Sequence, residues 1–299
     1  MSSVIETSGL GKSFTKKRAV NDLNLQVPEG SIFAFLGPNG SGKTTTIKML
    51  MNIIEPSVGT ATVLGVKSSN LSSKEFAQIG YVSENQEIPE WMTVRRLVNY
   101  CKPYYPTWDD AFCDTLLKQF QLPLDQPLKS LSRGMKMKAT LASSLAYRPR
   151  LLVLDEPFSG LDVLVRDEFI RGVLELSEQE HWTVFVSSHD IDEVERLADW
   201  VGIMKDGELQ LCEPVSSLQA RFRKIEAVVP GGTQVPTERP DNWLLLEHAG
   251  HRLGFVDSQY QEGVTEQQLM DRMPGCGPIE SNPMSLRDIF LSLARTYRL

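Results

Sequence analysis

The 299-residue chain lacks any unbroken run of 18 or more apolar residues, which is the length that a membrane-spanning helix needs. Its first residues, MSSVIETSGLGKSF, also lack the apolar core of a secretory signal peptide. We therefore expect a soluble, cytoplasmic protein. If such a protein works at a membrane, it must dock onto another chain that is embedded there.

Positive charge is also in short supply. The chain has 31 Lys and Arg residues against 38 Asp and Glu residues, which gives a formal net charge of −7. Proteins that bind nucleic acids usually carry a basic face, so this balance predicts no nucleic-acid partner. A local basic patch on an acidic chain stays open as the alternative.

Cysteine is scarce, and none of the four residues forms a CxxC pair: Cys101, Cys113, Cys212 and Cys276. Inert thiols in a reducing compartment are the favoured interpretation. The alternative is a zinc site built from His248, His251 and Cys276, because a metal needs several convergent ligands. An HxxH spacing alone is weak support for zinc.

The chain does contain strands that alternate with helices. Alternating apolar and polar positions predict antiparallel edge strands over residues 4–27. Apolar runs predict buried strands at SIFAFLG (31–37), ATVLG, IGYVS, LLVLDEP (151–157) and TVFVSSHD, and VGIMKDGEL predicts a hairpin. Helical spacing follows the first run and dominates residues 88–150, a predicted helical insertion. The pattern indicates an α/β fold with a mostly parallel sheet.

The character of the chain changes near residue 222, where RKIEAVVPGGTQVPTERPDN is rich in Pro, Gly and polar residues. Next come a predicted hairpin over WLLLEHAGHRLGFVDS, a helix over TEQQLMDRM and a last helix over SLRDIFLSLARTYRL. We predict a main domain over residues 1–222 and a small C-terminal α+β appendage over residues 223–299.

The strongest chemical motif is a glycine-rich loop between the first buried strand and a helix. The loop matches GxxxxGK[ST], and we expect all of it to bind phosphate groups: Gly37, Pro38, Asn39, Gly40, Ser41, Gly42, Lys43, Thr44 and Thr45. The glycines allow successive backbone N–H groups to point at phosphate oxygens. Lys43 is expected to reach the β- and γ-phosphates, and the Thr44 hydroxyl to ligate Mg²⁺.

Polar residues end two further buried strands. Asp155 lies near the end of LLVLDEP and is expected to hold the Mg²⁺ shell, while Glu156 polarises a water toward the γ-phosphate. His189 ends TVFVSSH, and ligands of open α/β sheets lie at the carboxyl ends of strands, so we place it near the γ-phosphate. The alternatives are a merely polar strand end and a hydrogen-bonded loop histidine.

Five motifs in order, GPNGSGKT, LSRGM, LLVLDEP, SGLD and SSHD, make residues 4–222 resemble the ATP-binding subunit of an ABC transporter. The resemblance implies a P-loop NTPase core with an antiparallel β edge and a helical subdomain. It also implies ATP and Mg²⁺ as cofactors, and ATP hydrolysis with Lys43, Glu156 and His189 as catalytic residues. In this family two subunits lie head to tail, and each signature loop caps the γ-phosphate held by the other.

The signature loop of the family is LSGGQ, and LSRGM is similar to it. The resemblance therefore implies that Ser132, Arg133 and Gly134 contact the ATP of a partner chain, with a plain helix cap at Ser132 as the alternative. Phe14 fits the aromatic residue that stacks on adenine, with a core aromatic as the alternative. Asp162, in SGLD, fits the loop that crosses the dimer interface.

Three residues depart from the family pattern. Glu84 stands where Gln is usual, Arg133 replaces a glycine, and Met135 replaces a glutamine. Glu84 can still ligate Mg²⁺, although its charge adds to those of the neighbouring acids. Arg133 adds positive charge near the partner's phosphates. The departures bear on the rate of hydrolysis and its coupling to transport rather than on ATP binding.

The resemblance implies a homodimeric engine of an exporter, peripheral on the inner face of the cell membrane and coupled to a separate integral membrane permease. We expect the permease to dock on residues 84–93 and the helices after them. The exposed candidates there are Trp91, Met92, Tyr104, Tyr105 and Trp108, with a place in the core of the insertion as the alternative. Two other functions stay open: an ATP-switched protein of DNA repair or of the ribosome, and a weakly hydrolysing half of a heterodimer.

Overall fold

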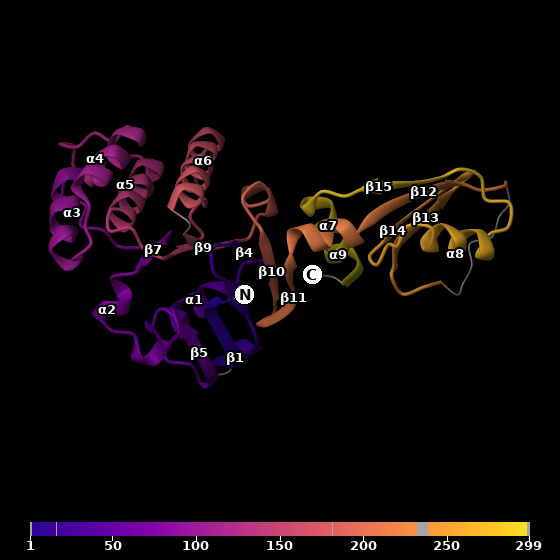
Figure 1. The fold of residues 1–299 in the computed structure, drawn as a ribbon, viewed down its shortest axis with the longest axis horizontal. Coiled ribbons are helices and arrows are strands. Elements are labelled where there is room, and N and C mark those ends of the chain that lie inside the picture. Colours follow the sequence, from indigo (N-terminus) through magenta and orange to yellow (C-terminus); the bar gives the residue numbers. More distant parts are fainter. Residues whose placement is uncertain (1, 16, 181, 232–238, 298–299) are drawn as a thin grey trace. The chain divides into compact units, whose positions relative to one another are not determined.

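The computed structural model describes residues 2–15, 17–180, 182–231 and 239–297. The chain divides into two compact units, Met1–Cys212 and Glu213–Leu299 (Figure 1). The division falls after Cys212 rather than at residue 222, because helix α7 (Val215–Arg221) packs with the second unit. Arg221 of this helix donates a hydrogen bond to the carbonyl oxygen of Ser258 at 2.6 Å.

The larger unit is built on a six-stranded sheet with the order β11-β10-β4-β9-β8-β7. Its strands are β4 (Ile32–Leu36), β7 (Ile79–Ser83), β8 (Leu151–Asp155), β9 (Thr183–Ser188), β10 (Trp200–Lys205) and β11 (Glu208–Pro214). All neighbours from β10 to β7 pair in parallel. Every residue of β4, β8 and β9 is buried, as continuous apolar runs in a parallel sheet predict. The predicted mostly parallel sheet is confirmed.

The N-terminal strands form a second sheet, built around β1. The strands are β1 (Ser3–Phe14), β2 (Lys17–Leu23), β3 (Gln26–Pro28), β5 (Val58–Val63) and β6 (Val66–Lys67). β1 pairs antiparallel with β2, β3 and β5. Leu10 and Val20 of this sheet share one buried core with Phe33 of β4 and Ile47 of helix α1 (Lys43–Leu50). The predicted antiparallel edge is therefore a sheet of its own that shares a core with β4 and α1.

The helical insertion lies between β7 and β8. Side-chain caps at Thr93, Asp109 and Ser132 accept backbone N–H groups and so fix where its three helices begin. The helices lie side by side in Figure 1: α3 (Val94–Cys101), α4 (Asp110–Gln119) and α5 (Arg133–Leu145). The other helices of this unit are α2 (Ser73–Phe76) and α6 (Val163–Glu180). Within the described residues, no helix is long and apolar enough to cross a bilayer.

The aromatic candidates for docking divide into two groups. Trp91 is 65% exposed and Tyr104 is 66% exposed, as a docking surface requires. Met92 is only 8% exposed, so its predicted exposure is wrong: in the turn before α3 it faces the core while Trp91 faces out. Tyr105 and Trp108 are half-buried, and their rings lie 6.5 Å apart. Only Trp91 and Tyr104 stay as strong surface candidates.

The smaller unit has a four-stranded sheet with the order β13-β14-β12-β15. Its strands are β12 (Arg223–Val228), β13 (Trp243–Ala249), β14 (Arg252–Asp257) and β15 (Ile279–Pro283), and its further helices are α8 (Val264–Arg272) and α9 (Leu286–Tyr297). The predicted hairpin is β13–β14, and both predicted helices are present. Ile225, Trp243, Phe255 and Leu269 form a core of this unit's own.

Candidate functional site

The strand register of the large sheet brings four strand ends to one edge. Leu36 of β4 pairs with Ser188 of β9, and Asp155 of β8 pairs with Ser187 of β9. On its other side Asp155 pairs with Ser83 of β7. Because these strands are parallel, whatever follows each of them emerges at the same edge. The glycine-rich loop, the acidic pair and His189 therefore meet there.

The backbone of the glycine-rich loop needs glycine where it turns into α1. Gly42 has φ +110°, and a Cβ at this position would lie 2.5 Å from the carbonyl oxygen of Ala19. That gap is too small for any side chain, so the turn depends on glycine. Pro38, Asn39 and Gly40 form the exposed crest of the loop.

The loop then leads into an uncapped helix start. Gly42 precedes α1 without a side-chain cap, so the first N–H groups of the helix are available to an anion. The Ser41 hydroxyl is buried and has no hydrogen-bond partner among the described residues. A buried hydroxyl of this kind needs a partner, and a phosphate oxygen would supply one. Thr44 and Thr45 follow as half-buried residues of the first turn.

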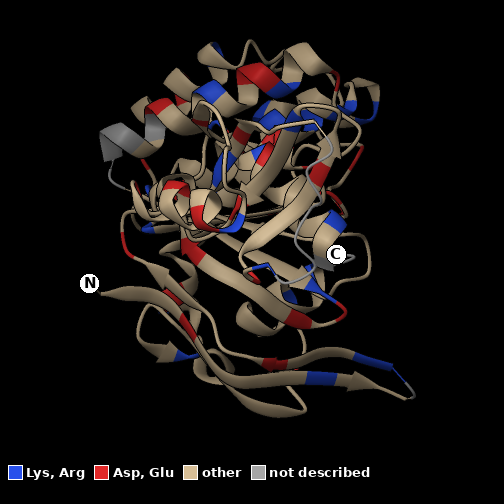
Figure 2. Ribbon diagram, turned by 90° about the vertical axis from the view of Figure 1, so that its right-hand side faces the viewer, with Lys and Arg blue, Asp and Glu red and all other residues tan. Residues whose placement is uncertain are grey.

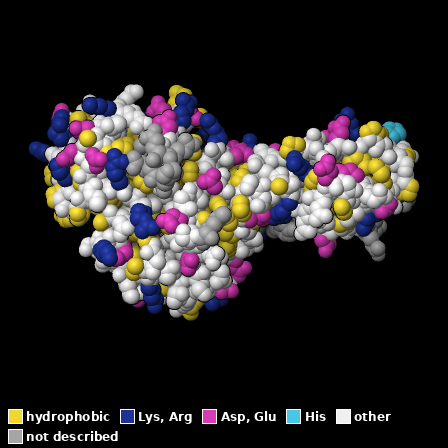
Figure 3. Space-filling model, in the orientation of Figure 1, with side chains coloured by type: hydrophobic (Ala, Val, Ile, Leu, Met, Phe, Trp, Pro, Cys, Tyr) yellow, Lys and Arg dark blue, Asp and Glu magenta, His cyan; other side chains and the backbone are white. Residues whose placement is uncertain are grey.

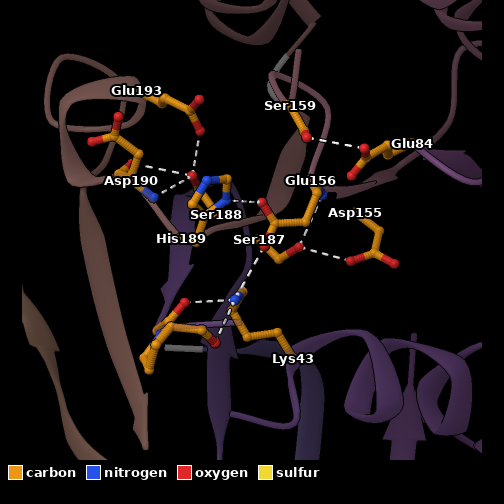
Figure 4. Close-up of polar contacts among 12 residues, drawn as sticks. Lys43, Glu84, Asp155, Glu156, Ser159, Ser187, Ser188, His189, Asp190 and Glu193 are labelled. Carbon is orange, nitrogen blue, oxygen red and sulfur yellow. Dashed lines mark hydrogen bonds and ion pairs between the residues drawn. The ribbon is translucent and has the colours of Figure 1, made fainter. Parts of the chain in front are cut away.

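Lys43 is held at the centre of the site (Figure 4). Its Nζ donates to the carbonyl oxygens of Gly37 at 2.6 Å and Pro38 at 3.3 Å. It also lies 3.1 Å from Oε1 of Glu156. The Lys43 side chain is only 4% exposed, so these three oxygens replace the water that its charge would otherwise bind. Each of them is a contact that an incoming phosphate could take over.

Asp155 is 1% exposed and accepts two hydrogen bonds at Oδ1. The Thr44 hydroxyl lies 3.1 Å from this oxygen, and the Ser187 hydroxyl lies 2.8 Å from it. Burial raises the pKa of Asp155, and the neighbouring Glu156 raises it further, while the two hydroxyl groups and Lys43 lower it. The carboxylate is thus held ready for a cation that would offset its burial.

Glu156 lies between a cation and a histidine. Its Oε2 is 2.8 Å from Nδ1 of His189, while Oε1 faces Lys43 (Figure 4). The hydrogen bond to Glu156 raises the pKa of His189 above its usual value. Glu156 has φ +52°, a region where non-glycine residues are uncommon and which often marks functional sites.

The signature loop caps helix α5 and touches its own chain. The Ser132 hydroxyl accepts a hydrogen bond from the N–H of Met135 at 3.2 Å. Ser132 is therefore a helix cap in this structure. Arg133 forms an ion pair with Glu84, whose carboxylate also accepts the Ser159 hydroxyl at 2.9 Å. Glu84 thus contacts Arg133 and Ser159, whereas the partners of Asp155 are Thr44 and Ser187.

The remaining predicted residues have simple local settings. Gly134 lies where α5 and α6 approach, because a Cβ there would be 2.5 Å from Cγ1 of Val165. Asp162 Oδ1 accepts the N–H of Val165 at 3.0 Å, at the start of α6. Phe14 is 47% exposed, with the Lys12 ammonium 5.2 Å from its ring centre. An exposed ring is open to a stacking partner, so Phe14 is no core aromatic.

The sequence reasoning missed two contributors. Ser187 bonds to Asp155 and also accepts the backbone N–H of Glu156 at 3.0 Å, so one hydroxyl positions both acids. Glu193 is buried and accepts a hydrogen bond from Ser188, and burial raises its pKa. Ser187 and Ser188 end a buried strand, as Asp155 does. Their position at the end of that strand could have identified them as site residues. No comparable pattern marks Glu193.

The zinc alternative finds no support in the described ranges. They contain no group of three or more His, Cys, Asp or Glu residues able to hold a metal ion. His251 Nδ1 lies 3.2 Å from the carbonyl oxygen of Val229, as in a hydrogen-bonded loop histidine. Mg²⁺ at an ATP site differs, because it is held by one or two protein carboxylates together with substrate phosphates and water.

Comparisons with known proteins agree with this geometry. A family profile described as ABC transporter matches residues 20–159. The uncharacterized ABC transporter ATP-binding protein YcbN of Bacillus subtilis (strain 168) is 33% identical over 239 residues, 78% of this chain and 77% of that protein. The bacitracin transport ATP-binding protein BcrA of Bacillus licheniformis is 33% identical over 226 residues, 75% of this chain and 74% of that protein.

A solved structure shares the fold of this chain. The dimeric, post-hydrolysis structure of the ATP-binding cassette MJ0796, bound to ADP and Pi, superposes with a TM-score of 0.63 at 22% identity. The match covers 71% of this chain and 98% of that one. With these relatives, the chain belongs to the family of ABC transporter ATP-binding proteins.

Proposed function

We propose that this chain drives an exporter as a homodimer coupled to a separate membrane permease, on the inner face of the cell membrane. ABC cassettes bind and hydrolyse ATP, and this chain is an ATPase of that family. The observation that carries the proposal is one cluster at the sheet edge, with Lys43 paired to Glu156 and Thr44 bonded to Asp155.

Lys43 and Glu156 are proposed to exchange partners when ATP binds. The β- and γ-phosphates would lie over the N–H groups at the start of α1, and Lys43 would turn from the Gly37 and Pro38 carbonyls toward them. Glu156 then loses its ion pair with Lys43. Its Oε1, which had faced Lys43, becomes free to accept a proton from the attacking water while Oε2 stays bonded to His189, so Glu156 acts as general base.

Thr44 and Asp155 are the proposed protein ligands of Mg²⁺. Their oxygens lie 3.1 Å apart, and magnesium in ATPases uses one or two carboxylates together with substrate phosphates. Bound Mg²⁺ would neutralise charge that develops on the phosphates during transfer. Glu84 is a further candidate once its carboxylate leaves Arg133 and Ser159.

His189 is proposed to hold Glu156 in position and to face the γ-phosphate. Its Nδ1 is occupied by Glu156, so the other ring nitrogen is free to point at substrate. A raised pKa favours the protonated ring, which would add positive charge beside the phosphate. Phe14, with its exposed ring, is proposed to stack on the adenine.

The signature loop is proposed to complete the site of a second copy. The start of α5 offers backbone N–H groups, the Ser132 hydroxyl and the Arg133 guanidinium, all of which are donors suited to phosphate oxygens. Asp162, at the start of α6, is proposed to cross the same interface. The dimeric state of the related MJ0796 cassette supports this arrangement.

A groove beside Glu84 is the proposed docking place of the permease. It has a volume of about 430 Å³ and is lined by residues of the loop after β7 and by α5, among them Glu87, Ile88, Arg133 and Met137. The exposed Trp91 lies in the same loop. The bacitracin transport role of the related BcrA supports a transport partner, and the groove supplies a surface for it.

The deciding experiment is the solution mass of a Glu156→Gln variant with and without ATP and Mg²⁺. Removing the general base should trap bound ATP, so the mass should double only when ATP is present. A variant that binds ATP but stays monomeric would contradict the homodimer. In that case the second half-site would come from another chain.

The docking surface has its own test. Trp91→Ala should reduce copurification with a coexpressed membrane permease, because an exposed Trp that becomes buried at an interface is often an anchor. Ile53→Ala is the matched control, since Ile53 is 53% exposed but lies after α1, outside the groove. Copurification that Trp91→Ala leaves unchanged would argue against this surface.

The non-transporter alternative gains nothing from the charge distribution. Figure 2 shows Lys and Arg interspersed with Asp and Glu along the helices, and Figure 3 shows the same mixture over α3 to α5. A nucleic-acid partner would favour a stripe of positive charge. Salt-sensitive RNA or DNA binding, together with loss of any membrane partner, would revive that alternative.

A further inference from the structure

The two charged departures from the family pattern meet each other. Glu84 replaces a glutamine and Arg133 replaces a glycine, and their side chains form an ion pair across 49 residues of sequence. Each side chain offsets the charge that the other one adds. Together they neutralise one another, so we treat them as one unit.

The pair also holds the segment that follows the acids. Ser159 donates to the same Glu84 oxygen at 2.9 Å, as Figure 4 shows. The Arg133 guanidinium lies against Gly160, where a Cβ would come within 2.7 Å of Nη1. Three separate segments, after β7, at the start of α5 and after β8, are therefore joined at Glu84 and Arg133.

Both ends of this junction reach the site. The N–H of Glu84 donates to the carbonyl oxygen of Asp155 at 3.0 Å, and the N–H of Ser159 donates to that of Glu156 at 3.3 Å. On the opposite side, Glu84 and Arg133 line the groove proposed for the permease. A change in either side chain of the pair therefore alters the surroundings of both acids and of any partner bound in the groove.

We propose that Glu84 and Arg133 form a latch that competes with ATP-driven dimerisation. In the free chain, Arg133 is neutralised by Glu84 of its own chain. In the dimer, Arg133 turns to the γ-phosphate held by the second copy, and Glu84 is released toward the metal side of the site. This inference rests on the proposed homodimer.

The competition predicts opposite effects for the two residues. Glu84→Gln removes the rival acceptor and leaves Arg133 free for phosphate, so dimerisation becomes easier. Arg133→Gln removes the phosphate donor as well as the latch, so dimerisation becomes harder. The ion pair is partly exposed, so its contribution is small. For Glu84→Gln we therefore expect the ATP concentration at half-dimerisation to fall by about two- to fivefold. If the ion pair only stabilised the fold, Glu84→Gln and Arg133→Gln would change the ATP concentration needed for dimerisation in the same direction.

The test measures the ATP concentration at half-dimerisation in the Glu156→Gln background, by solution mass. We expect Glu84→Gln to lower it, Arg133→Gln to raise it, and Arg133→Lys to fall between Arg133→Gln and the parent. In the double variant, Glu84→Gln should have no further effect, because no latch is left to release. Asp125→Asn, which breaks an exposed ion pair with Arg95, is the control and should change nothing, because neither residue lines the groove.

Four results would overturn the proposal. If Glu84→Gln raises the required ATP concentration, the pair stabilises the competent form. If it lowers the concentration equally without Arg133, simple repulsion between Glu84 and ATP explains the effect. A parent variant that never dimerises overturns the homodimer and the exchange together, whereas a dimer indifferent to both residues overturns the latch alone.

Discussion

The Ser187 hydroxyl offers the sharpest test of the site geometry. It is fully buried, donates to Asp155 at 2.8 Å and accepts the N–H of Glu156 at 3.0 Å. Ser187→Ala would remove a hydrogen bond to a carboxylate, worth about 1.5–3 kcal/mol, and would leave an N–H without its partner at a cost of about 1–3 kcal/mol. Because the two effects overlap, we expect the free energy of unfolding to fall by about 2–4 kcal/mol.

Thermal unfolding of the purified chain measures this loss. For a unit ending at Cys212, about 2–4 °C per kcal/mol gives a fall in melting temperature of about 5–15 °C. Since Ser187 lowers the pKa of Asp155, the loss should be largest when Asp155 is ionised. It should shrink as the pH falls through the raised folded pKa.

A buried serine elsewhere provides the control. Ser143 donates to the helical carbonyl of Thr140 at 2.8 Å, not to a carboxylate, so Ser143→Ala should cost less than about 1 kcal/mol. Equal melting temperatures for the two variants would refute the bridging role of Ser187. A loss at Ser187 below about 0.5 kcal/mol would refute it as well.

Three further predictions address single contacts. Gly42→Ala should weaken the binding of a fluorescent ATP analogue by about tenfold or more, because its Cβ meets the Ala19 carbonyl; normal affinity would contradict the need for glycine. Ser132→Ala should lower stability by about 1 kcal/mol through loss of the α5 cap, and an unchanged melting temperature would exclude that cap. His189→Gln should destabilise most below about pH 6.5 and least above the raised pKa, because protonated His189 pairs with Glu156; a pH-independent difference would contradict the pairing.

The large sheet was predictable because its strands are continuous apolar runs that end in polar residues. Alternation with helices then implied parallel pairing, and the structure has it. The antiparallel pairing within residues 4–27 was predicted, but the further partner of β1 was not. Residues 4–27 show which positions face a core, but nothing local shows that β1 pairs with β5, whose residues lie some fifty positions later. The addition of β5, which makes this edge a separate sheet, was therefore not predicted.

Sequence reasoning found the charged members of the site and missed those that position them. Lys43, Asp155 and Glu156 stand in motifs whose residue types match phosphate and magnesium chemistry. Ser187 reads as one more small residue in a buried strand, and only the register with β8 places it under both acids. The ion pair between Glu84 and Arg133 depends on tertiary packing, which no spacing rule reports.

Two core clusters within the described residues draw on different stretches of the chain. One gathers residues from Val4 to Met204, and the other gathers residues from Ile225 to Met273. Each unit thus has apolar burial of its own to stabilise it. Because the core of the C-terminal unit lies within that unit, substitutions there need not disturb the strand ends that hold the acids. A chain ending at Cys212 keeps Lys43, Glu156 and His189, so it should still bind ATP without the second unit.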